Sequence, residues 1–312
     1  SVRETGRTYF ERNEANPLEE DLIIVDEASM LDISLFYHLL CALKDGARLI
    51  LVGDIDQLPP VGAGEPLKDL MSWGYVPIVR LKRIFRQEEG SGIVENAALI
   101  RKGEMCVPDE AGEFRIVYAA DDEDAYRIVM DLCRELNYGN EENKMLLQVL
   151  SPMYRGVCGV DHLNESLQEM IHGEKVPDGM KFFPGDKVMQ TRNDYEKGIY
   201  NGDVGTVWTA TPQKVFVRYF DKEVVYEGEE RFDLRLAYAV TVHKSQGSEY
   251  ETVIFILRPS QHNMLQRNLL YTGVTRARKN TILVTAPDAL RRALAIQHTG
   301  NRYSLFLPFL KS

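Results

Sequence analysis

Leu22-Ile23-Ile24-Val25-Asp26-Glu27-Ala28-Ser29 brings two adjacent carboxylates directly after four apolar residues. A continuous apolar run of this length, rich in β-branched side chains, predicts a strand that is buried on both faces of a parallel sheet. Ligands of such sheets bind beyond the carboxyl ends of the strands, where Asp26 and Glu27 lie. Mg²⁺ on a nucleotide prefers hard oxygen ligands and keeps most of its waters, so Asp26 alone can hold it, and Glu27 can orient or deprotonate an attacking water. A strand that ends in two solvated acids is the alternative.

A second apolar segment, 48–52, runs into a loop rich in glycine and proline, 53–64. Gln57 lies just past the end of this strand, so we expect it at the same sheet edge as Glu27. An amide there can hold a water and contact a terminal phosphate, as glutamines do in other nucleotide hydrolases. DEAS followed by GDIDQLPPVGAG resembles motifs II and III of superfamily 1 helicases, most closely the RecD-like branch (the exonuclease V alpha-subunit family).

Length and composition are those of an ordinary globular protein, with 312 residues, 44% hydrophobic and 27% charged. No apolar run reaches transmembrane length and no signal peptide is evident, so we expect a cytoplasmic protein with no membrane partner. The four cysteines are dispersed and form no CxxC pair. This spacing favours reduced thiols over a zinc site or a set of disulfides.

The net charge of −10 is unevenly distributed along the chain. Residues 109–142 hold eleven acids and three bases, whereas residues 258–302 hold eight bases and one acid. A motor that holds a DNA strand in a cleft needs local positive potential and not a basic total. The acidic total therefore does not exclude a nucleic-acid partner.

No GxxxxGK[ST] phosphate loop occurs anywhere in the sequence. In the resembled family this loop precedes DEAS, on the first strand and helix of the same domain. We therefore expect the chain to begin partway through a RecA-like domain, as a fragment of a longer protein. The alternative is a natural protein that has lost ATP hydrolysis.

Two basic stretches resemble motifs that supply arginines to a nucleotide. KRIFRQ at 82–87 resembles motif IV, whose arginine maps onto Arg86, with Arg83 as second choice. The segment 268–279 resembles motif VI, with Arg276 as the second arginine on the γ-phosphate. In a cleft that excludes water, a guanidinium on a phosphate is worth far more than on a surface. The alternatives are a basic surface turn and, for the second stretch, cations that favour a helix C-terminus.

The polar stretch TVHKSQGSE, which begins at Thr241, separates two apolar segments. Such a cluster is costly to bury unless it binds something. It resembles motif V nearly residue for residue. The resemblance implies that Thr241, His243 and Lys244 face DNA. It also implies that Gly247 and Glu249 face the nucleotide, with Glu249 accepting a bond from a ribose hydroxyl.

The loop 151–156 follows a buried strand and resembles the family's loop that meets single-stranded DNA. Tyr154 can stack on a base there, and Arg155 can contact a phosphate. Both side chains also fit a purely structural loop.

From residue 183 the pattern changes to short strands and turns, including the hairpin signal Asn201-Gly202. This pattern resembles the small Src-homology-3-like barrel of RecD-like helicases, which helps to bind single-stranded DNA in that family. Asn193 and Tyr195 lie at its edge and are further DNA candidates. A β-insertion without DNA contact is the alternative.

The fold class that follows is α/β, with two RecA-like parallel-sheet domains, the first truncated at its N-terminus, and a small Src-homology-3-like β-barrel inserted in the second. We assign residues 1–88 to the partial first motor domain and 89–184 with 236–312 to the second. Residues 185–235 form the inserted barrel.

Motifs II to VI occur in order from Asp26 to Lys279, so the resemblance covers nearly the whole chain. It implies the motor portion of an ATP-dependent DNA helicase or translocase that uses ATP and Mg²⁺ and acts on single-stranded DNA. The resemblance also implies 5′-to-3′ polarity, a role in recombination or repair, and exonuclease V-type partner subunits. Without the phosphate loop, we expect the 312 residues alone to be inactive as an ATPase. The alternatives are a non-catalytic DNA-binding or assembly subunit and the motor part of a conjugative relaxase-helicase.

Overall fold

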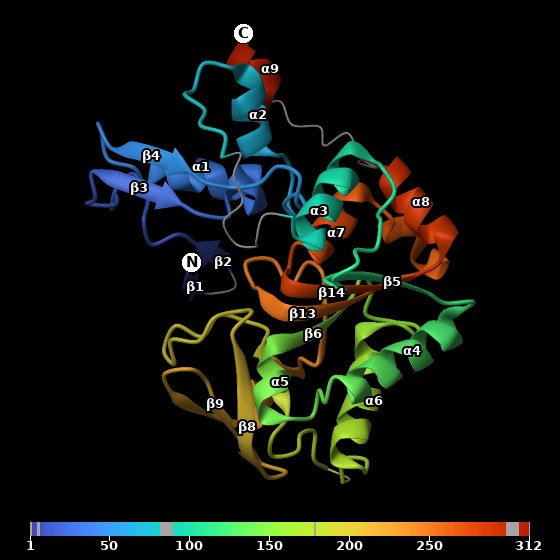
Figure 1. Cartoon of the computed structure of the whole chain (residues 1–312). Helices are drawn as coiled ribbons and strands as arrows, with labels where there is room; N and C mark the ends of the chain where they lie inside the picture. Colours follow the sequence, from blue (N-terminus) through green and yellow to red (C-terminus); the bar gives the residue numbers. More distant parts are fainter. Residues whose placement is uncertain (1, 5–6, 82–89, 178, 298–305, 312) are drawn as a thin grey trace. The chain divides into compact units, whose positions relative to one another are not determined.

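The computed structural model describes residues 2–4, 7–81, 90–177, 179–297 and 306–311. The chain forms two compact units, Ser1–Arg83 with His298–Ser312 and Ile84–Gln297. Figure 1 shows the elements of both units coloured along the sequence. In the part of the chain that is described, no helix is long and apolar enough to cross a membrane.

The first unit contains a short parallel sheet and an antiparallel strand pair. β3 (Leu22–Val25) and β4 (Arg48–Leu51) pair in parallel, and β1 (Val2–Glu4) pairs with β2 (Arg7–Tyr9) in the opposite sense. The remaining elements of this unit are η1 (Ala28–Met30), α1 (Ile33–Cys41), α2 (Pro66–Trp73) and α9 (Phe306–Lys311). α1 begins where it does because the carboxylate of Asp32 accepts a bond from Leu35 N at 2.8 Å, a side-chain N-cap.

One face of the β3–β4 pair is covered and the other is exposed. Val25, Leu49 and Leu51 pack against a small core of Ala28, Leu31 and Phe36. On the other face, Leu22 and Ile24 are 47% and 61% exposed. The prediction of a strand buried on both faces is therefore wrong for β3, because the described residues supply apolar cover on one side only.

The last helix belongs to the first unit. The rings of Phe36 and Phe306 meet edge to face, with centroids 5.8 Å apart. The sequence assigned residues 236–312 to the second motor domain, whereas the structure groups α9 with the first unit because of this apolar contact.

A five-stranded parallel sheet forms the centre of the second unit. Its strand order is β12-β6-β13-β14-β5, and each neighbouring pair is parallel. The strands are β5 (Phe114–Tyr118), β6 (Leu147–Ser151), β12 (Ala239–Thr241), β13 (Tyr250–Leu257) and β14 (Ala277–Thr285). Short helical segments α5 (Glu141–Leu146) and η3 (Pro259–Met264) flank it.

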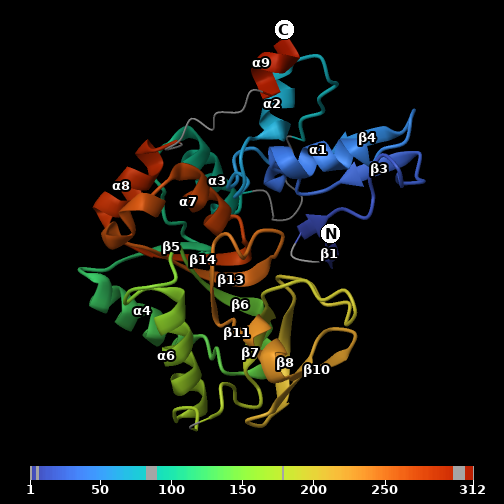
Figure 2. The same cartoon turned by 180° about the vertical axis from the view of Figure 1, so that it is seen from behind.

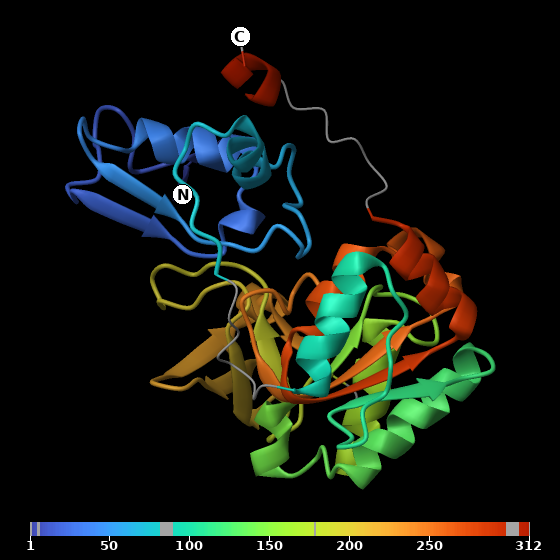
Figure 3. The same ribbon diagram turned by 45° about the horizontal axis from the view of Figure 1, so that its top comes forward.

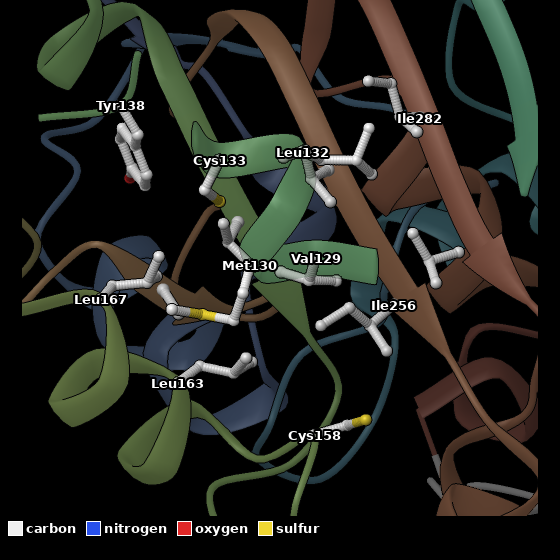
Figure 4. Packing of buried hydrophobic residues seen from close by; sticks show 14 of the residues in the cluster. Val129, Met130, Leu132, Cys133, Tyr138, Cys158, Leu163, Leu167, Ile256 and Ile282 are labelled. Carbon is white, nitrogen blue, oxygen red and sulfur yellow. The ribbon is translucent and has the colours of Figure 1, made fainter. Parts of the chain in front are cut away.

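Helices cover both faces of this sheet (Figure 2). α3 (Gly92–Lys102), α7 (Arg267–Val274) and α8 (Pro287–Ala295) lie on one face, and α4 (Asp122–Glu135) and α6 (Val160–His172) lie on the other. Ile254 and Ile256 of β13 point toward α4 and α6, where they join a buried cluster with Val129 and Leu163. Figure 4 shows this packing, with Ile256 and Ile282 facing the side chains of the two helices.

Phe255, between Ile254 and Ile256 in β13, faces the other helical layer, which contains α7. A Cβ at Gly273 of α7 would lie 2.5 Å from the ring of Phe255, so only glycine lets this helix approach the sheet so closely. β13 is thus buried on both faces, as a near-continuous apolar run in a parallel sheet should be.

An antiparallel sheet interrupts the second unit between α6 and β12. Its order is β10-β9-β8-β7-β11, with η2 (Gly228–Asp233) before the last strand. Figure 3 shows these strands in yellow and gold. They are β7 (Lys187–Gln190), β8 (Val204–Ala210), β9 (Lys214–Arg218), β10 (Glu223–Glu227) and β11 (Leu234–Leu236). The sheet has a separate apolar core that includes Phe182, Val217 and Leu234.

Buried polar side chains join this insertion to the parallel sheet. Asp186, at its start, accepts bonds from Tyr238 Oη at 2.9 Å and from Gln168 Nε2 at 2.5 Å. Lys187 Nζ donates to Gln148 Oε1 at 2.9 Å, and burial lowers the pKa of Lys187 to about 7. Buried polar groups need such partners, so these bonds fix where the insertion enters and leaves the unit.

Candidate functional site

Asp26 and Glu27 follow β3 directly, at the carboxyl edge of the first unit's sheet. Asp26 is exposed, and its carboxylate accepts a bond from Glu27 N at 2.8 Å. Glu27 has φ of 50°, in the left-handed region, which is uncommon for a residue with a Cβ. Strained backbone of this kind gathers at functional sites. An exposed carboxylate at a sheet edge fits Mg²⁺ on a nucleotide, which takes few protein ligands.

The loops after β3 and β4 lie against each other. Ala28 N donates to Val52 O at 2.8 Å. A Cβ at Gly53 would lie 2.8 Å from Ser29 N, so the close approach of the two loops requires glycine there. The structure therefore places Gln57, which follows Gly53, at the same sheet edge as Asp26.

Gln57 carries an unpaired buried oxygen. Gln57 Oε1 and Ser29 Oγ are both buried, and neither has a hydrogen-bond partner among the described residues. Both line a cavity of about 10 Å³, together with Leu58 and Glu65. Buried polar atoms without a protein partner are rare, and a bound water or a ligand usually accounts for them.

Arg276 and Glu249 lie at the amino edge of the second unit's parallel sheet. Arg276 directly precedes β14, and Glu249 directly precedes β13. Arg276 is 2% exposed, and its guanidinium donates to Thr272 O and Ser248 O, both at 3.2 Å. Glu249 Oε2 accepts a bond from Arg278 Nε at 2.7 Å, a partner that the sequence did not predict. Gly247, with φ of 75°, is exposed in the loop between them and β12. Arg83 and Arg86 lie outside the described residues.

The motif V segment links the two edges of this sheet. Thr241 ends β12 at the carboxyl edge, and Glu249 precedes β13 at the amino edge. Thr241 is only 4% exposed, and its hydroxyl accepts a bond from Lys244 N at 3.2 Å, so it shapes the turn and presents no surface. His243 is half-buried, which lowers its pKa and keeps the ring neutral at pH 7.

A cavity of about 990 Å³ lies between the parallel sheet's loops and the inserted antiparallel sheet. Its lining comprises Tyr154, Arg155, Asp161, Thr191, Arg192, Glu229, Glu230, Phe232, Asp233, Arg235 and Lys244. A cavity of this size can hold several nucleotides or one large ligand. Three of the predicted DNA residues, Tyr154, Arg155 and Lys244, come together on its wall from two separate loops.

Asn193 and Tyr195 do not line the cavity. Hydrogen bonds through Asn201 connect them to Lys244, which does. Asn193 Nδ2 donates to Tyr195 Oη at 3.2 Å, and Asn193 Oδ1 accepts from Asn201 N at 2.9 Å. Asn201 Oδ1 in turn accepts from Lys244 Nζ at 2.6 Å. The hairpin turn that the sequence identified at Asn201 thus positions the motif V lysine, a role that sequence reasoning missed.

Sequence reasoning also missed three cavity residues of the insertion, Arg192, Phe232 and Arg235. A signal for two of them exists in the segment RFDLR at 231–235, where bases alternate with an aromatic residue. The neighbouring acids conceal this signal, because the local net charge is not positive.

Comparisons with known proteins agree with this geometry. Three family models match the chain: an AAA domain at 4–115, the ATP-dependent RecD-like DNA helicase SH3 domain at 163–219, and the UvrD-like helicase C-terminal domain at 236–284. The ATP-dependent RecD2 DNA helicase of Deinococcus radiodurans is 37% identical over 304 residues, covering 96% of this chain and 41% of that protein. The RecBCD enzyme subunit RecD of Mycolicibacterium smegmatis is 33% identical over 316 residues, covering 95% of this chain and 56% of that protein.

The chain is similar to RecD-like helicases over most of its length. It spans about half the length of the curated relatives it matches. The resemblance drawn from DEAS and the later motifs is therefore confirmed.

Solved structures show the same fold. The Pif1 helicase from Bacteroides in complex with ADP-AlF3 and single-stranded DNA has a TM-score of 0.58 at 20% identity, covering 98% of this chain and 78% of that one. Pif1 from Candida albicans has a TM-score of 0.55 at 19% identity, covering 89% and 74%. With the SH3 family match, this likeness confirms the predicted fold class of RecA-like parallel sheets and an inserted Src-homology-3-like barrel.

Proposed function

We propose that this RecD-like chain is the motor portion of an ATP-dependent DNA helicase or translocase that acts on single-stranded DNA. The observation that carries the proposal is the motif V segment. Lys244 lies on the wall of the large cavity, and Glu249, five residues further along, lies at the amino edge of the same sheet, which the motif V resemblance assigns to the nucleotide. In this proposal the segment couples the nucleotide side to the DNA side. In this proposal residues 1–88 are the partial first motor domain, 89–184 with 236–312 are the second except for α9, which packs in the first unit, and 185–235 are the barrel.

On the nucleotide side, the RecD-like motifs assign a role in phosphoryl transfer to each residue. Asp26 would hold Mg²⁺, which when bound neutralises charge on the β- and γ-phosphates. Glu27 orients and deprotonates the attacking water, and Gln57 contacts the γ-phosphate. Arg86 and Arg276 neutralise the charge that develops in the transition state, a role that can be worth about 10³–10⁵ in rate. Glu249 and Gly247 hold the ribose side of ATP, and Arg83 is the alternative to Arg86.

On the DNA side, the cavity of the second unit is the proposed track. Tyr154 stacks on a base, and Arg155 and Lys244 contact phosphates. Asn193 and Tyr195 extend this surface along the barrel, while Thr241 and His243 shape the turn that carries Lys244. Pif1 from Bacteroides has been crystallised with single-stranded DNA, which supports this ligand class for a chain of the same fold.

The similarity to RecD-like helicases further supports 5′-to-3′ polarity and a role in recombination or repair. Several relatives are named as the RecD subunit of the RecBCD enzyme, so partner subunits of the exonuclease V type are part of the proposal. Because the 312 residues contain no GxxxxGK[ST] loop, we expect the chain alone to turn over ATP negligibly.

The test is binding of a fluorescein-labelled oligothymidine, measured by anisotropy across a salt series, with Lys244→Ala beside the wild-type chain. We expect binding that weakens with salt, an affinity loss of about threefold to tenfold in the variant, and a salt slope smaller by about 0.7. No binding at low salt would contradict the DNA track and favour an assembly role. Steady DNA-stimulated ATPase by the purified chain would contradict its expected inactivity.

A further inference from the structure

The cavity of the second unit has balanced charge, although single-stranded DNA tracks are usually positive. Its basic residues are Arg155, Arg192, Arg235 and Lys244, and its acidic residues are Asp161, Glu229, Glu230 and Asp233. A phosphate backbone that enters this cavity meets as many carboxylates as cations. The arrangement of these charges therefore decides whether the site can bind DNA at all.

Two of the four cations are paired with carboxylates of the same cavity. Arg192 Nε lies 3.4 Å from Asp233 Oδ1, and Arg235 Nη1 lies 3.9 Å from Asp161 Oδ1. The two arginine side chains are 75% and 62% exposed, so each pair is weak and opens easily. A phosphate, with its full charge and several oxygens, can replace a carboxylate at such a guanidinium.

Glu230 and Lys244 of the cavity have partners other than the cavity's own charged groups. Glu230 Oε2 lies 2.6 Å from Lys197 Nζ, a cation outside the cavity lining. Lys244 Nζ donates to the neutral amide of Asn201 at 2.6 Å. Burial and then the nearby charge of Arg235 lower the pKa of Lys244, so an anion that sits between the two cations relieves their repulsion.

We propose that Asp161 and Asp233 are exchangeable counterions for two DNA-contacting arginines, Arg235 and Arg192. The proposal rests on the proposed function of the cavity and extends it to the barrel side. A DNA phosphate displaces the carboxylate from each arginine. The displaced carboxylate then repels the DNA strand and lowers the affinity of the cavity for it. A track of this kind binds moderately and releases quickly, which suits a protein that must let go of each nucleotide as it moves.

Phe232 completes this barrel-side wall. It is 71% exposed, it lines the cavity, and it precedes Asp233 in the chain. An exposed aromatic ring beside two phosphate-binding arginines offers a base a surface to stack on.

The experiment compares Asp161→Asn and Asp233→Asn with Glu229→Gln in the anisotropy assay with labelled oligothymidine. All three variants remove one carboxylate charge from the same cavity, but only the first two release an arginine. We expect Asp161→Asn and Asp233→Asn each to tighten binding by about threefold to tenfold at low salt. The salt slope should steepen by about 0.7 in each, because the released arginine now adds a full phosphate contact. Glu229→Gln should change affinity by less than about twofold.

The double variant Asp161→Asn with Arg235→Ala isolates the pair. If the carboxylate acts through Arg235, Asp161→Asn should change affinity by less than about twofold once Arg235 is removed, as expected for Glu229→Gln. Equal tightening in Glu229→Gln, or weaker binding in Asp161→Asn, would overturn the counterion proposal while leaving the DNA track in place. Absence of binding by the wild-type chain would overturn the track, and the counterion proposal with it. Unchanged thermal midpoints in all variants confirm that each is folded.

Discussion

Two parallel strands with similar sequences have different surroundings in this protein. In β13, Val253, Ile254, Phe255 and Ile256 are fully buried, and in β3, Leu22 and Ile24 are largely exposed. β13 lies in the middle of five strands between two helical layers, whereas the β3–β4 pair has apolar cover on one face among the described residues. The comparison teaches that an apolar run specifies a strand, while the neighbouring layers decide how many of its faces are buried.

The largest expected effect tests this contrast directly with one substitution in each unit. Ile254→Ala removes a fully buried side chain and should lower the free energy of unfolding of the second unit by about 2–5 kcal/mol. Ile24→Ala, at a site that is 61% exposed, should cost less than about 1 kcal/mol. The two tryptophans, Trp73 and Trp208, lie one in each unit, so urea unfolding of single-tryptophan variants reports each unit separately. Similar losses at both sites would remove the contrast.

A pH dependence should distinguish the second unit through Lys187. Its pKa is about 7 when folded and about 10.4 when unfolded, so the unfolded chain binds more protons between these values. The free energy of unfolding should therefore rise with pH above 7, by up to about 1.4 kcal/mol per pH unit. Lys187→Met should flatten this rise, and the exposed control Lys175→Met should keep it, in urea titrations at pH 7, 8 and 9. A rise that persists in Lys187→Met would assign it to another group.

Two exposed aromatic residues of the barrel test which of its faces takes part in the proposed binding of single-stranded DNA. Phe232→Ala removes a ring from the cavity and should weaken oligothymidine binding by about 1–3 kcal/mol, with an unchanged salt slope. Trp208→Ala is the matched control, because Trp208 lies outside the cavity lining and stacks on Arg218, 4.3 Å from the ring centroid. An equal loss in both variants would mean that the barrel binds DNA on another face.

The smallest expected effect concerns backbone strain in the first unit. Glu27→Gly relieves a left-handed residue and should stabilise this unit by about 0.5–1 kcal/mol, while it removes the carboxylate proposed to activate water. Asn137→Gly is the control in the second unit, since Asn137 also has φ of 50° but asparagine tolerates that region. Its effect should stay within about 0.5 kcal/mol. A loss of stability in Glu27→Gly would show that the glutamate side chain supports the fold.

The sequence was sufficient for the order of elements and for the resemblance to RecD-like helicases, because motifs II, III, V and VI are local patterns of residue type. DEAS and the glycine-proline loop fixed the edge at which Asp26 and Gln57 lie. The hairpin signal at Asn201 located the insertion. These features depend on neighbours in the chain, which a sequence displays directly.

The remaining features depend on residues far apart in the chain. Burial of β3 depends on a second layer, which its own four residues do not specify. The motif V resemblance named Thr241 as a DNA residue but did not show that its side chain is turned inward to Lys244 N. The walls of the cavity come from segments at 154–161, 191–192, 229–235 and 244, so Arg192 and Phe232 became candidates only when the fold brought them to the same cavity as Tyr154.

The polar bond between Tyr238 and Asp186 has a mechanical consequence for the barrel. These two residues stand where the chain leaves and enters the insertion, and they are bonded to each other and to α6 in the interior. The two ends of the insertion are therefore held together at one buried carboxylate. Any movement of the barrel away from its sheet would have to break buried polar bonds, which are costly to leave without partners.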